Sequence, residues 1–437
     1  MRIEAVFTRG LPPFRDQTIR FPVSQNDEAA DVQLLTGNNG TGKTRLLCLL
    51  AAAFGNPTNL KQRCATNETN SSVLLRMPDD SYGVWIGSDE RIHHFHSDLD
   101  SDALVEQLEQ RPSNSMVPSG VNVFARQKGI EKIVRPDLPG AAFAFRGTSR
   151  VTDAPVEPLK TLVFGMPEDY LDFDREPDSA LLCQSMVNLK MTAAMESLRT
   201  TKSGSKRATQ IISRLEKTIS DISGRDFYFE VVPHPTIRIR PFWGIEMAFD
   251  QLPDGLRSVI GWLVACVANL DAKYPDHASP LDIPVVLLVD EPESHLHVAW
   301  QRLLLPAAQQ LFPNAQVIAA THSPFAIASV NSGWLHTFKF GSEDHSVEAR
   351  GRTAPRGDSY IDAVEDTLGV DEWFDPETED LLSQFRERSK AVKNNGDLSK
   401  LQELGNQIAS RGSALQDIMA RELRQAERLL TAAAAKP

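Results

Sequence analysis

The residues of this chain with the clearest chemical signature form a glycine-rich stretch near the N-terminus, residues 37–44. The stretch fits the Walker A pattern of a glycine, four residues, a second glycine, a lysine and then serine or threonine. A mostly apolar run, residues 32–35, precedes it, and a longer one, residues 46–54, follows it. This order predicts a strand, a loop and a helix. The residues that we expect to contact a nucleotide here are Gly37, Asn38, Asn39, Gly40, Thr41, Gly42, Lys43, Thr44 and Arg45.

Each part of this loop has a physical role toward phosphate. Without Cβ atoms, the glycines let successive backbone N–H groups turn inward, and the start of a helix adds a partial positive charge. A di- or triphosphate is the ligand that suits such a loop. Lys43 would reach the outer phosphates, and the hydroxyl of Thr44 would bind Mg²⁺. The alternative is a glycine-rich turn without function, which the strand, helix and lysine together disfavour.

Two acids follow a second predicted strand. Residues 283–289 form an apolar run typical of a buried parallel strand, and the run ends in Asp290 and Glu291. At the carboxyl end of such a strand the two carboxylates would lie beside the phosphate loop. Asp290 would hold Mg²⁺, directly or through water, and Glu291 would polarise the attacking water.

Two further segments complete the set. Residues 252–258 open a long apolar helix, and Asp254, Gly255 and Arg257 at its start form a second candidate anion site. A last buried strand, residues 316–321, is followed by His322, which suits a contact to a γ-phosphate. Each segment alone is common, since Asp-Glu pairs are often solvated turns and a lone histidine is more often structural. Their occurrence together, in this order, predicts one site with Lys43, Glu291 and His322 as catalytic residues.

Length and charge limit the kind of protein. A chain of 437 residues is long enough for two or three compact units, and its composition is typical of a soluble globular protein. No apolar run approaches the roughly 20 residues that a membrane helix needs, so we expect a cytoplasmic protein without a membrane partner. The formal charge of −12 means that any contact with DNA must come from a local patch or from a partner chain.

One basic patch is present in an otherwise polar segment. A solvated helix face is the favoured interpretation, and a DNA-binding surface is the alternative. The patch consists of Lys190, Arg199, Lys202, Lys206, Arg207, Arg214 and Lys217.

The remaining pattern predicts an α/β protein with a helical end piece. We expect a pair of edge strands at 3–7 and 17–21 with Phe14 in their turn, where its ring would stack on adenine or simply pack. Other expected elements are an antiparallel meander over 73–95, a variable region over 96–160 with a strand at 121–125, two helices over 178–223 with a break at 200–205, an edge strand over 227–239, and helices after 358.

The four segments 37–44, 252–258, 285–291 and 319–323 together resemble the ATPase head of the ABC superfamily, in the branch that includes Rad50, SMC, RecF and the OLD-type ATPases. The resemblance implies a mixed sheet with an antiparallel N-terminal subsheet, with ATP and Mg²⁺ as cofactors. It also implies a homodimer or higher homo-oligomer in which two heads sandwich two ATP molecules. Each ATP would be held by Lys43 and Asp290 of one chain and by residues 252–257 of the other.

On this basis the chain is predicted to contain four segments. They are a first ATPase lobe with Walker A (1–177), an inserted helical segment (178–224), a second ATPase lobe with the signature-like loop, the acids and the histidine (225–345), and a helical C-terminal interaction domain (346–437).

The sequence departs from the family pattern at the signature-like loop. The family normally has a serine after the leucine, and Pro253 stands there in this chain. Proline has neither a hydroxyl nor an N–H to offer a γ-phosphate, so turnover is expected to be slow, with Arg257 as a substitute charge. The family's glutamine loop has only two weak candidates, Gln127 and Gln184.

The tail resembles the C-terminal helices of the Septu-type anti-phage ATPases (PtuA-like), which work with a separate HNH nuclease subunit. The resemblance implies a nucleotide-controlled scaffold or sensor in a bacterial defence complex. The alternative for the tail is a helical dimerisation appendage. The alternatives for the whole chain are a DNA-repair ATPase of the RecF or OLD kind and an interaction module that binds nucleotide with little turnover.

Overall fold

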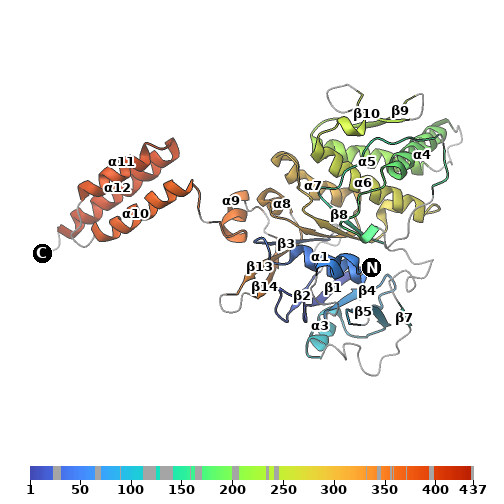
Figure 1. Ribbon diagram of the computed structural model, residues 1–437, viewed down its shortest axis with the longest axis horizontal. Helices are drawn as coiled ribbons and strands as arrows, with labels where there is room; N and C mark the ends of the chain where they lie inside the picture. Colours follow the sequence, from blue (N-terminus) through green and yellow to red (C-terminus); the bar gives the residue numbers. More distant parts are fainter. Residues whose placement is uncertain are drawn as a thin grey trace. The chain divides into compact units, whose positions relative to one another are not determined.

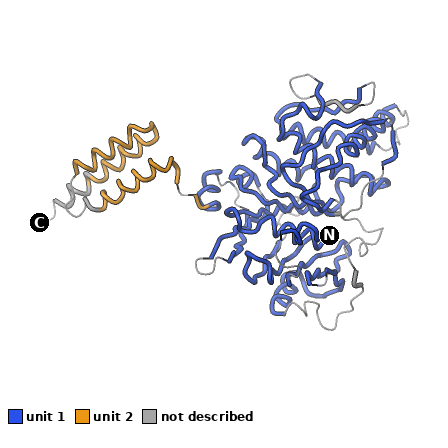
Figure 2. The backbone as a smooth tube through the Cα atoms, viewed as in Figure 1, with its two compact units in different colours: residues 1–368 blue, residues 369–437 orange. Residues whose placement is uncertain are grey.

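The computed structural model places the chain in two compact units, Met1–Leu368 and Gly369–Pro437 (Figure 2). The residues that it describes are 1–22, 31–63, 70–88, 90–111, 125–127, 141–157, 159–162, 170–198, 206–232, 236–240, 246–330, 332–341, 346–354, 357, 359–370, 372–392 and 398–434.

A six-stranded sheet forms the centre of the first unit (Figure 1). All neighbouring strands are parallel except the last pair, β13 and β14, which is antiparallel. Every residue of the three central strands is buried, as expected for a parallel sheet covered on both faces. In spatial order the strands are β14 (Val347–Thr353), β13 (Trp334–Phe340), β3 (Asp31–Gly37), β12 (Ala315–Ala320), β11 (Val285–Asp290) and β8 (Ala141–Arg146).

This order decides where the predicted site residues lie. The strand that leads to His322, β12, lies between the strand of the Walker A loop and the strand of the two acids. Because β3, β12 and β11 run in parallel, the three loops that follow them meet at one edge of the sheet. The predicted α/β class with a mixed sheet is confirmed.

A second, antiparallel sheet follows the N-terminus, as predicted. Strand β1 was expected at an edge, but it is an interior strand because β4 pairs with it on the side opposite β2. In spatial order the strands are β2 (Thr18–Arg20), β1 (Arg2–Phe7), β4 (Ser72–Arg76), β5 (Tyr82–Ile86), β6 (Arg91–Phe95) and β7 (Ala125–Gln127).

Helices cover both faces of the central sheet (Figure 1). Helix α1 (Lys43–Ala53) shares one hydrophobic core with β1, β4 and one face of the central strands. Helices α4 (Ser179–Leu198), α5 (Arg207–Ser223), α6 (Asp254–Lys273) and α7 (Val298–Leu311) share another core with the opposite face. The helices over 178–223 therefore belong to the main core of the first unit.

Helix α6 is the one helix of the described residues that is long and apolar enough to cross a membrane. However, 83% of the qualifying window is buried inside the protein, as in the central helix of a core.

Several elements differ from the sequence-based prediction. The variable region contains α3 (Ser101–Glu109) and the central-sheet strand β8. The strand expected over 227–239 is a hairpin, β9 (Tyr228–Val232) and β10 (Thr236–Arg240). Of the strand expected at 121–125 only residue 125 lies within the described residues, and the break at 200–205 lies outside them. Shorter elements are α2 (Thr58–Arg63), η4 (Phe249–Gln251), η5 (Pro280–Asp282), α8 (Pro324–Ser329), α9 (Tyr360–Asp362) and η6 (Ala363–Thr367).

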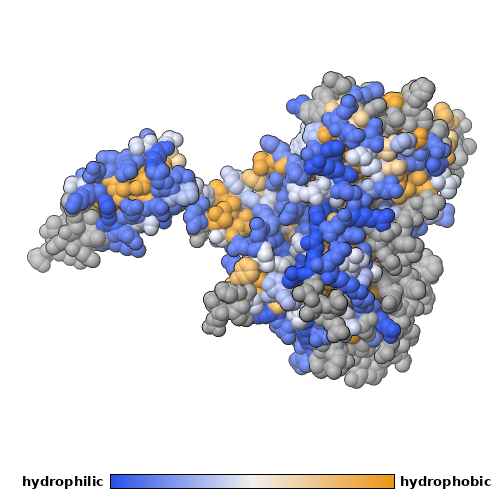
Figure 3. Space-filling model, in the orientation of Figure 1, coloured by the Kyte–Doolittle hydropathy of each residue, from blue (hydrophilic) through white to orange (hydrophobic). Residues whose placement is uncertain are grey.

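The second unit consists of three helices with their own core, α10 (Pro376–Val392), α11 (Leu398–Ala409) and α12 (Ser413–Ala434). Strand β14 lies within the predicted C-terminal segment 346–437, but it pairs with β13, so the first unit ends at Leu368 instead of residue 345. On the face seen in Figure 3, the helical unit carries an apolar area within a hydrophilic surround.

Candidate nucleotide-binding site

The loop between β3 and α1 requires glycine at both ends. Gly37 has a φ of 143°, and a Cβ there would lie 2.3 Å from the carbonyl oxygen of Phe338. Gly42 has a φ of 89°, and a Cβ there would lie 2.8 Å from the ring of Phe14. Both positions combine a left-handed backbone with a close approach, which only glycine accepts without strain.

Lys43 folds over this loop. Its Nζ donates to the carbonyl oxygens of Gly37 and Asn38 at 2.8 and 3.0 Å, and the side chain is buried. Gly42 is the N-cap of α1 and offers no side-chain acceptor, so the N–H groups of the first helical turn are free to bind an anion. The loop therefore combines a buried ammonium with backbone donors, which is an arrangement suited to phosphate groups.

Thr44 and Asp290 meet across the sheet edge. The Thr44 hydroxyl lies 3.0 Å from each of the two carboxylate oxygens of Asp290, which is only 4% exposed. Burial raises the pKa of Asp290, although the Thr44 hydroxyl acts in the opposite direction. Buried hard oxygen donors beside a phosphate loop fit Mg²⁺, which binds through one or two carboxylates plus substrate phosphates. The described residues contain no group of three or more His, Cys, Asp or Glu side chains that could hold a metal by themselves.

Glu291 has a fixed backbone and an exposed side chain. Its φ is 51°, and its N–H donates to the carbonyl of Ala320 at 2.8 Å. The chain after β8 packs directly against it, since a Cβ on Gly147 would lie 1.8 Å from the Glu291 carbonyl oxygen. The left-handed backbone and this close contact determine the direction in which Glu291 leaves the sheet edge.

His322 follows β12, between the phosphate loop and the two acids. Burial lowers its pKa, and the positive charge of Lys43 lowers it further. The imidazole is therefore neutral near pH 7 and has one N–H to donate. The structure thus brings Lys43, Thr44, Asp290 and His322 to one edge of the sheet, with Glu291 beside them.

The start of α6 does not join this group within one chain. Arg257 donates to Asp254 at 2.6 Å, and Arg150 lies 3.1 Å from the same carboxylate. Gly255 packs against the loop after β11, because a Cβ there would lie 2.5 Å from the carbonyl oxygen of His295. In the described part of the chain, neither Asp254 nor Arg257 has a hydrogen bond or ion pair with residues 37–45. Only the sandwich implied by the resemblance would bring them to a nucleotide.

Arg146 is a site residue that sequence analysis missed. It ends β8 in register with Asp290, and its Nε lies 4.0 Å from the Asp290 carboxylate, while Nη1 binds Asp174 at 2.9 Å. The available signal was the short apolar run over 141–145 just before it. Of the two glutamine candidates, Gln127 lies in β7 of the other sheet, and Gln184 in α4 forms hydrogen bonds with Glu157 and Asn188.

Two other residues near the loop have packing roles. Arg45 donates to the carbonyl of Pro12, in the turn that covers Gly42. Phe14 in the same turn is 6% exposed and meets the ring of Phe338 edge-on at 5.5 Å between centroids. Phe14 is therefore a packing residue rather than a stacking surface for adenine.

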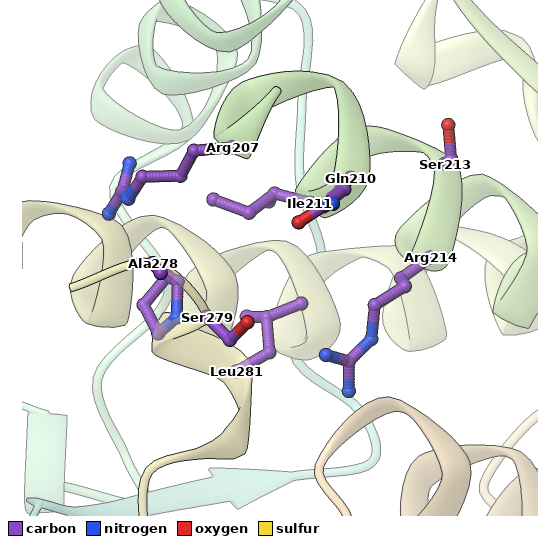
Figure 4. Close-up of a pocket in the computed structure, with 9 residues that line it drawn as sticks. Arg207, Gln210, Ile211, Ser213, Arg214, Ala278, Ser279 and Leu281 are labelled. Atoms are coloured by element: carbon purple, nitrogen blue, oxygen red, sulfur yellow. The ribbon is translucent and has the colours of Figure 1, made fainter. Parts of the chain in front are cut away.

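Of the residues in the basic patch, Arg199 and Lys202 lie outside the described residues, and four of the others form ion pairs within the chain. Lys190, Arg207, Arg214 and Lys217 form ion pairs with Glu216, Asp271, Asp282 and Asp221. Arg207 and Arg214 also line a cavity of about 230 Å³ between α5 and the segment before β11 (Figure 4). This cavity lies at the amino end of β11, whereas Asp290 ends that strand. The ion pairs of Lys190, Arg207 and Arg214 connect α5 to α4, α6 and η5, which favours the structural interpretation of these three residues over a DNA site.

The buried ammonium gives nucleotide binding a pH dependence. Burial lowers the pKa of Lys43 to about 8, against the opposing effect of Asp290, Glu291 and Glu293. The free protein then loses the Lys43 proton above that pH, while bound phosphates favour the charged form. We expect the nucleotide Kd to rise roughly tenfold or more between pH of about 7.5 and about 9.5, with proton uptake on binding. Calorimetric titration in buffers of different ionisation enthalpy measures both.

The control for this prediction is Lys43→Arg, whose guanidinium stays charged at both pH values. Its affinity should change little over the same pH interval. An equal pH slope in both proteins would assign the effect to another group.

Comparison with known proteins supports the grouping of these motifs. Residues 244–328 match the family described as "AAA domain, putative AbiEii toxin, Type IV TA system". The matched segment contains the start of α6, the acids after β11 and His322. It covers well under half of the chain and leaves out the phosphate loop.

Individual relatives are similar over different lengths. The Septu protein PtuA of Bacillus thuringiensis is 23% identical over 362 residues, which are 81% of this chain and 82% of PtuA. The Retron Ec83 probable ATPase of Escherichia coli is 28% identical over 99 residues, and the match spans 23% of this chain but only 18% of that protein. Among solved structures, the SMC head domain from Thermotoga maritima aligns with 80% of this chain and 99% of that one, at a TM-score of 0.37 and 12% identity.

Proposed function

We propose that this chain, an ABC-type ATPase that resembles the Septu protein PtuA, binds and hydrolyses ATP with Mg²⁺ and acts as a nucleotide-controlled scaffold in an anti-phage defence complex. The observation that supports it most is the contact of the Thr44 hydroxyl with both oxygens of buried Asp290, directly after the lysine of the phosphate loop. The similarity to PtuA over most of both chains supports the defence role.

In this proposal the residues of the sheet edge divide the chemistry. Lys43 and the N–H groups of the loop bind the outer phosphates, and Thr44 and Asp290 hold Mg²⁺. When bound, Mg²⁺ offsets negative charge on the phosphates. Glu291 accepts a hydrogen bond from the attacking water and orients it, and neutral His322 donates to a γ-phosphate oxygen.

Assembly is the second part of the proposal. Two chains would enclose ATP between the phosphate loop of one and the α6 start of the other, in the cytoplasm. Pro253 and the retention of Arg257 by Asp254 favour slow turnover, so ATP would license assembly more than drive repeated cycles. The three-helix unit would bind a nuclease subunit of the HNH type. Dimerisation through these helices is the alternative.

The test is phosphate release by the purified chain with ATP, measured with Mg²⁺ and with excess chelator. Release that requires Mg²⁺ supports the proposal, and its absence together with absent nucleotide binding contradicts it. Copurification with the product of the neighbouring gene tests the defence complex. Stimulation by DNA without any nuclease partner would instead indicate a repair ATPase, and binding without measurable release would indicate an interaction module.

A further inference from the structure

Glu293 connects the loop after β11 to the loop after β12. Its Oε1 accepts hydrogen bonds from the Thr321 hydroxyl at 2.7 Å, from the His322 N–H at 2.9 Å and from the Ser323 N–H at 3.2 Å. All three donors belong to the segment that carries His322. One carboxylate oxygen therefore binds the backbone N–H of the histidine and the backbone N–H of the residue after it.

The other oxygen of the same carboxylate, Oε2, is buried and accepts no hydrogen bond from the described residues. A buried carboxylate oxygen without a donor costs stability. Among the described residues, the hydrogen bonds that Glu293 Oε1 accepts all come from the segment that carries His322.

A second anchor fixes the far side of the segment. The Ser323 hydroxyl donates to the side chain of Gln301 in α7 at 2.6 Å and accepts from the Ala326 N–H at 3.2 Å as the cap of α8. The Glu291 N–H binds the Ala320 carbonyl just before the segment. His322 thus lies on a short segment held from three directions, and among the described residues Glu293 is the one that hydrogen-bonds to the histidine residue itself.

We propose that Glu293 is a positioning residue that holds His322 toward the γ-phosphate and couples it to the loop that carries Glu291. This inference rests on the proposed ATPase function. The donors to Oε1 all belong to residues 321–323, so this oxygen acts on the segment that carries His322. Its effect on the reaction passes through the orientation of His322.

The experiment compares Glu293→Ala, Glu293→Gln, His322→Ala and the double alanine variant. For Glu293→Ala we expect a kcat about tenfold or more below wild type, with a nucleotide Kd within about threefold, as for other residues that orient a reacting group. The double variant should be no slower than His322→Ala alone, because the two residues act as one unit. Glu293→Gln keeps an oxygen acceptor for the three donors and should stay within about threefold of wild type.

A measurement without turnover tests the geometry directly. In the nucleotide-free protein, the amides of His322 and Ser323 should exchange hydrogen about tenfold faster in Glu293→Ala, because each loses its acceptor. The matched control is Glu196→Ala. Glu196 accepts the same set of donors, two backbone N–H groups and a threonine hydroxyl, from residues 208 and 209 at the start of α5. This control should leave kcat and the exchange at 322–323 unchanged.

Three outcomes overturn the inference. If Glu293→Ala retains wild-type kcat and amide protection, Glu293 does not hold the segment. If Glu293→Gln is as slow as Glu293→Ala while the amides stay protected, the charge of Glu293 acts in the reaction and the positioning role is wrong. If the wild type shows no hydrolysis that depends on Lys43, the proposed function fails first, and the role toward the γ-phosphate fails with it.

Discussion

Replacing Lys43 with alanine should weaken ATP binding by at least about 100-fold, because the outer phosphates lose two or more charge-assisted hydrogen bonds of about 1.5–3 kcal/mol each. The lysine already points at the loop, where its Nζ binds two backbone carbonyls. On binding, the phosphates would replace these carbonyls as acceptors. The site therefore needs no rearrangement of the backbone, only an exchange of partners. Titration with a fluorescent ATP analogue measures the change.

Lys217→Ala is the matched control for this variant. Its side chain is 69% exposed and pairs with Asp221 on the same helix, so it removes the same charge without touching the loop. The control should bind ATP as wild type does, and both variants should unfold thermally near the wild-type temperature. An Lys43→Ala protein that is folded and binds ATP within about threefold of wild type would remove the basis of the proposed function.

Each part of the site that sequence analysis predicted is a short continuous segment of the chain. The phosphate loop, the acids after β11 and the histidine after β12 each follow directly from a buried strand, so residue type and strand end could be seen together. The Thr44 hydroxyl, next to Lys43, contacts the Asp290 carboxylate, so the phosphate loop and the first acid lie together. Local patterns suffice here because parallel strands bring their carboxyl ends to one edge.

The parts that it missed depend on pairing between distant segments. Strand β8 has no polar alternation, and it lies in a region rich in proline, serine and aspartate, so its place beside β11 could not be deduced. Arg146 was missed with it. The three hydrogen bonds of Glu293 span about thirty residues of sequence, and a glutamate in a polar turn gives no local sign of them.

The ion pair between Arg257 and Asp254 could also not be predicted from the local sequence pattern. The sequence indicated a cation at a helix start, which was expected to face phosphate. In the structure the guanidinium is 15% exposed and bound to its own chain. Asp254 lies between Arg150 and Arg257, so an arriving phosphate would compete with a carboxylate for both arginines. If two chains close around ATP as proposed, the Asp254 carboxylate would have to release these arginines, a competition that the sequence alone did not reveal.

Glu291→Gln should reduce kcat by about 100-fold or more while ATP binding is retained, because glutamine keeps the shape of the side chain but cannot accept a proton from the attacking water. Among the described residues the exposed side chain has one weak partner, the Ser294 hydroxyl at 3.4 Å, so we expect the substitution to remove little stability. With ATP and Mg²⁺ the variant should accumulate as dimers, which size-exclusion chromatography with light scattering detects. Glu157→Gln, an exposed glutamate that pairs with Lys160, is the control and should behave as wild type.

The ratio of wild-type to Glu291→Gln turnover also tests the consequence of Pro253. If the proline and the Asp254–Arg257 pair already make hydrolysis slow, the wild type itself should form long-lived dimers with ATP, and the ratio should fall toward one. A large ratio with short-lived wild-type dimers would mean that the α6 start supports catalysis without the serine, and that ATP drives repeated cycles. Unchanged turnover and unchanged assembly in Glu291→Gln would show that another residue orients the water. A water-orienting Glu291 would affect both measurements, because lost hydrolysis slows turnover and leaves ATP in place to hold the dimer.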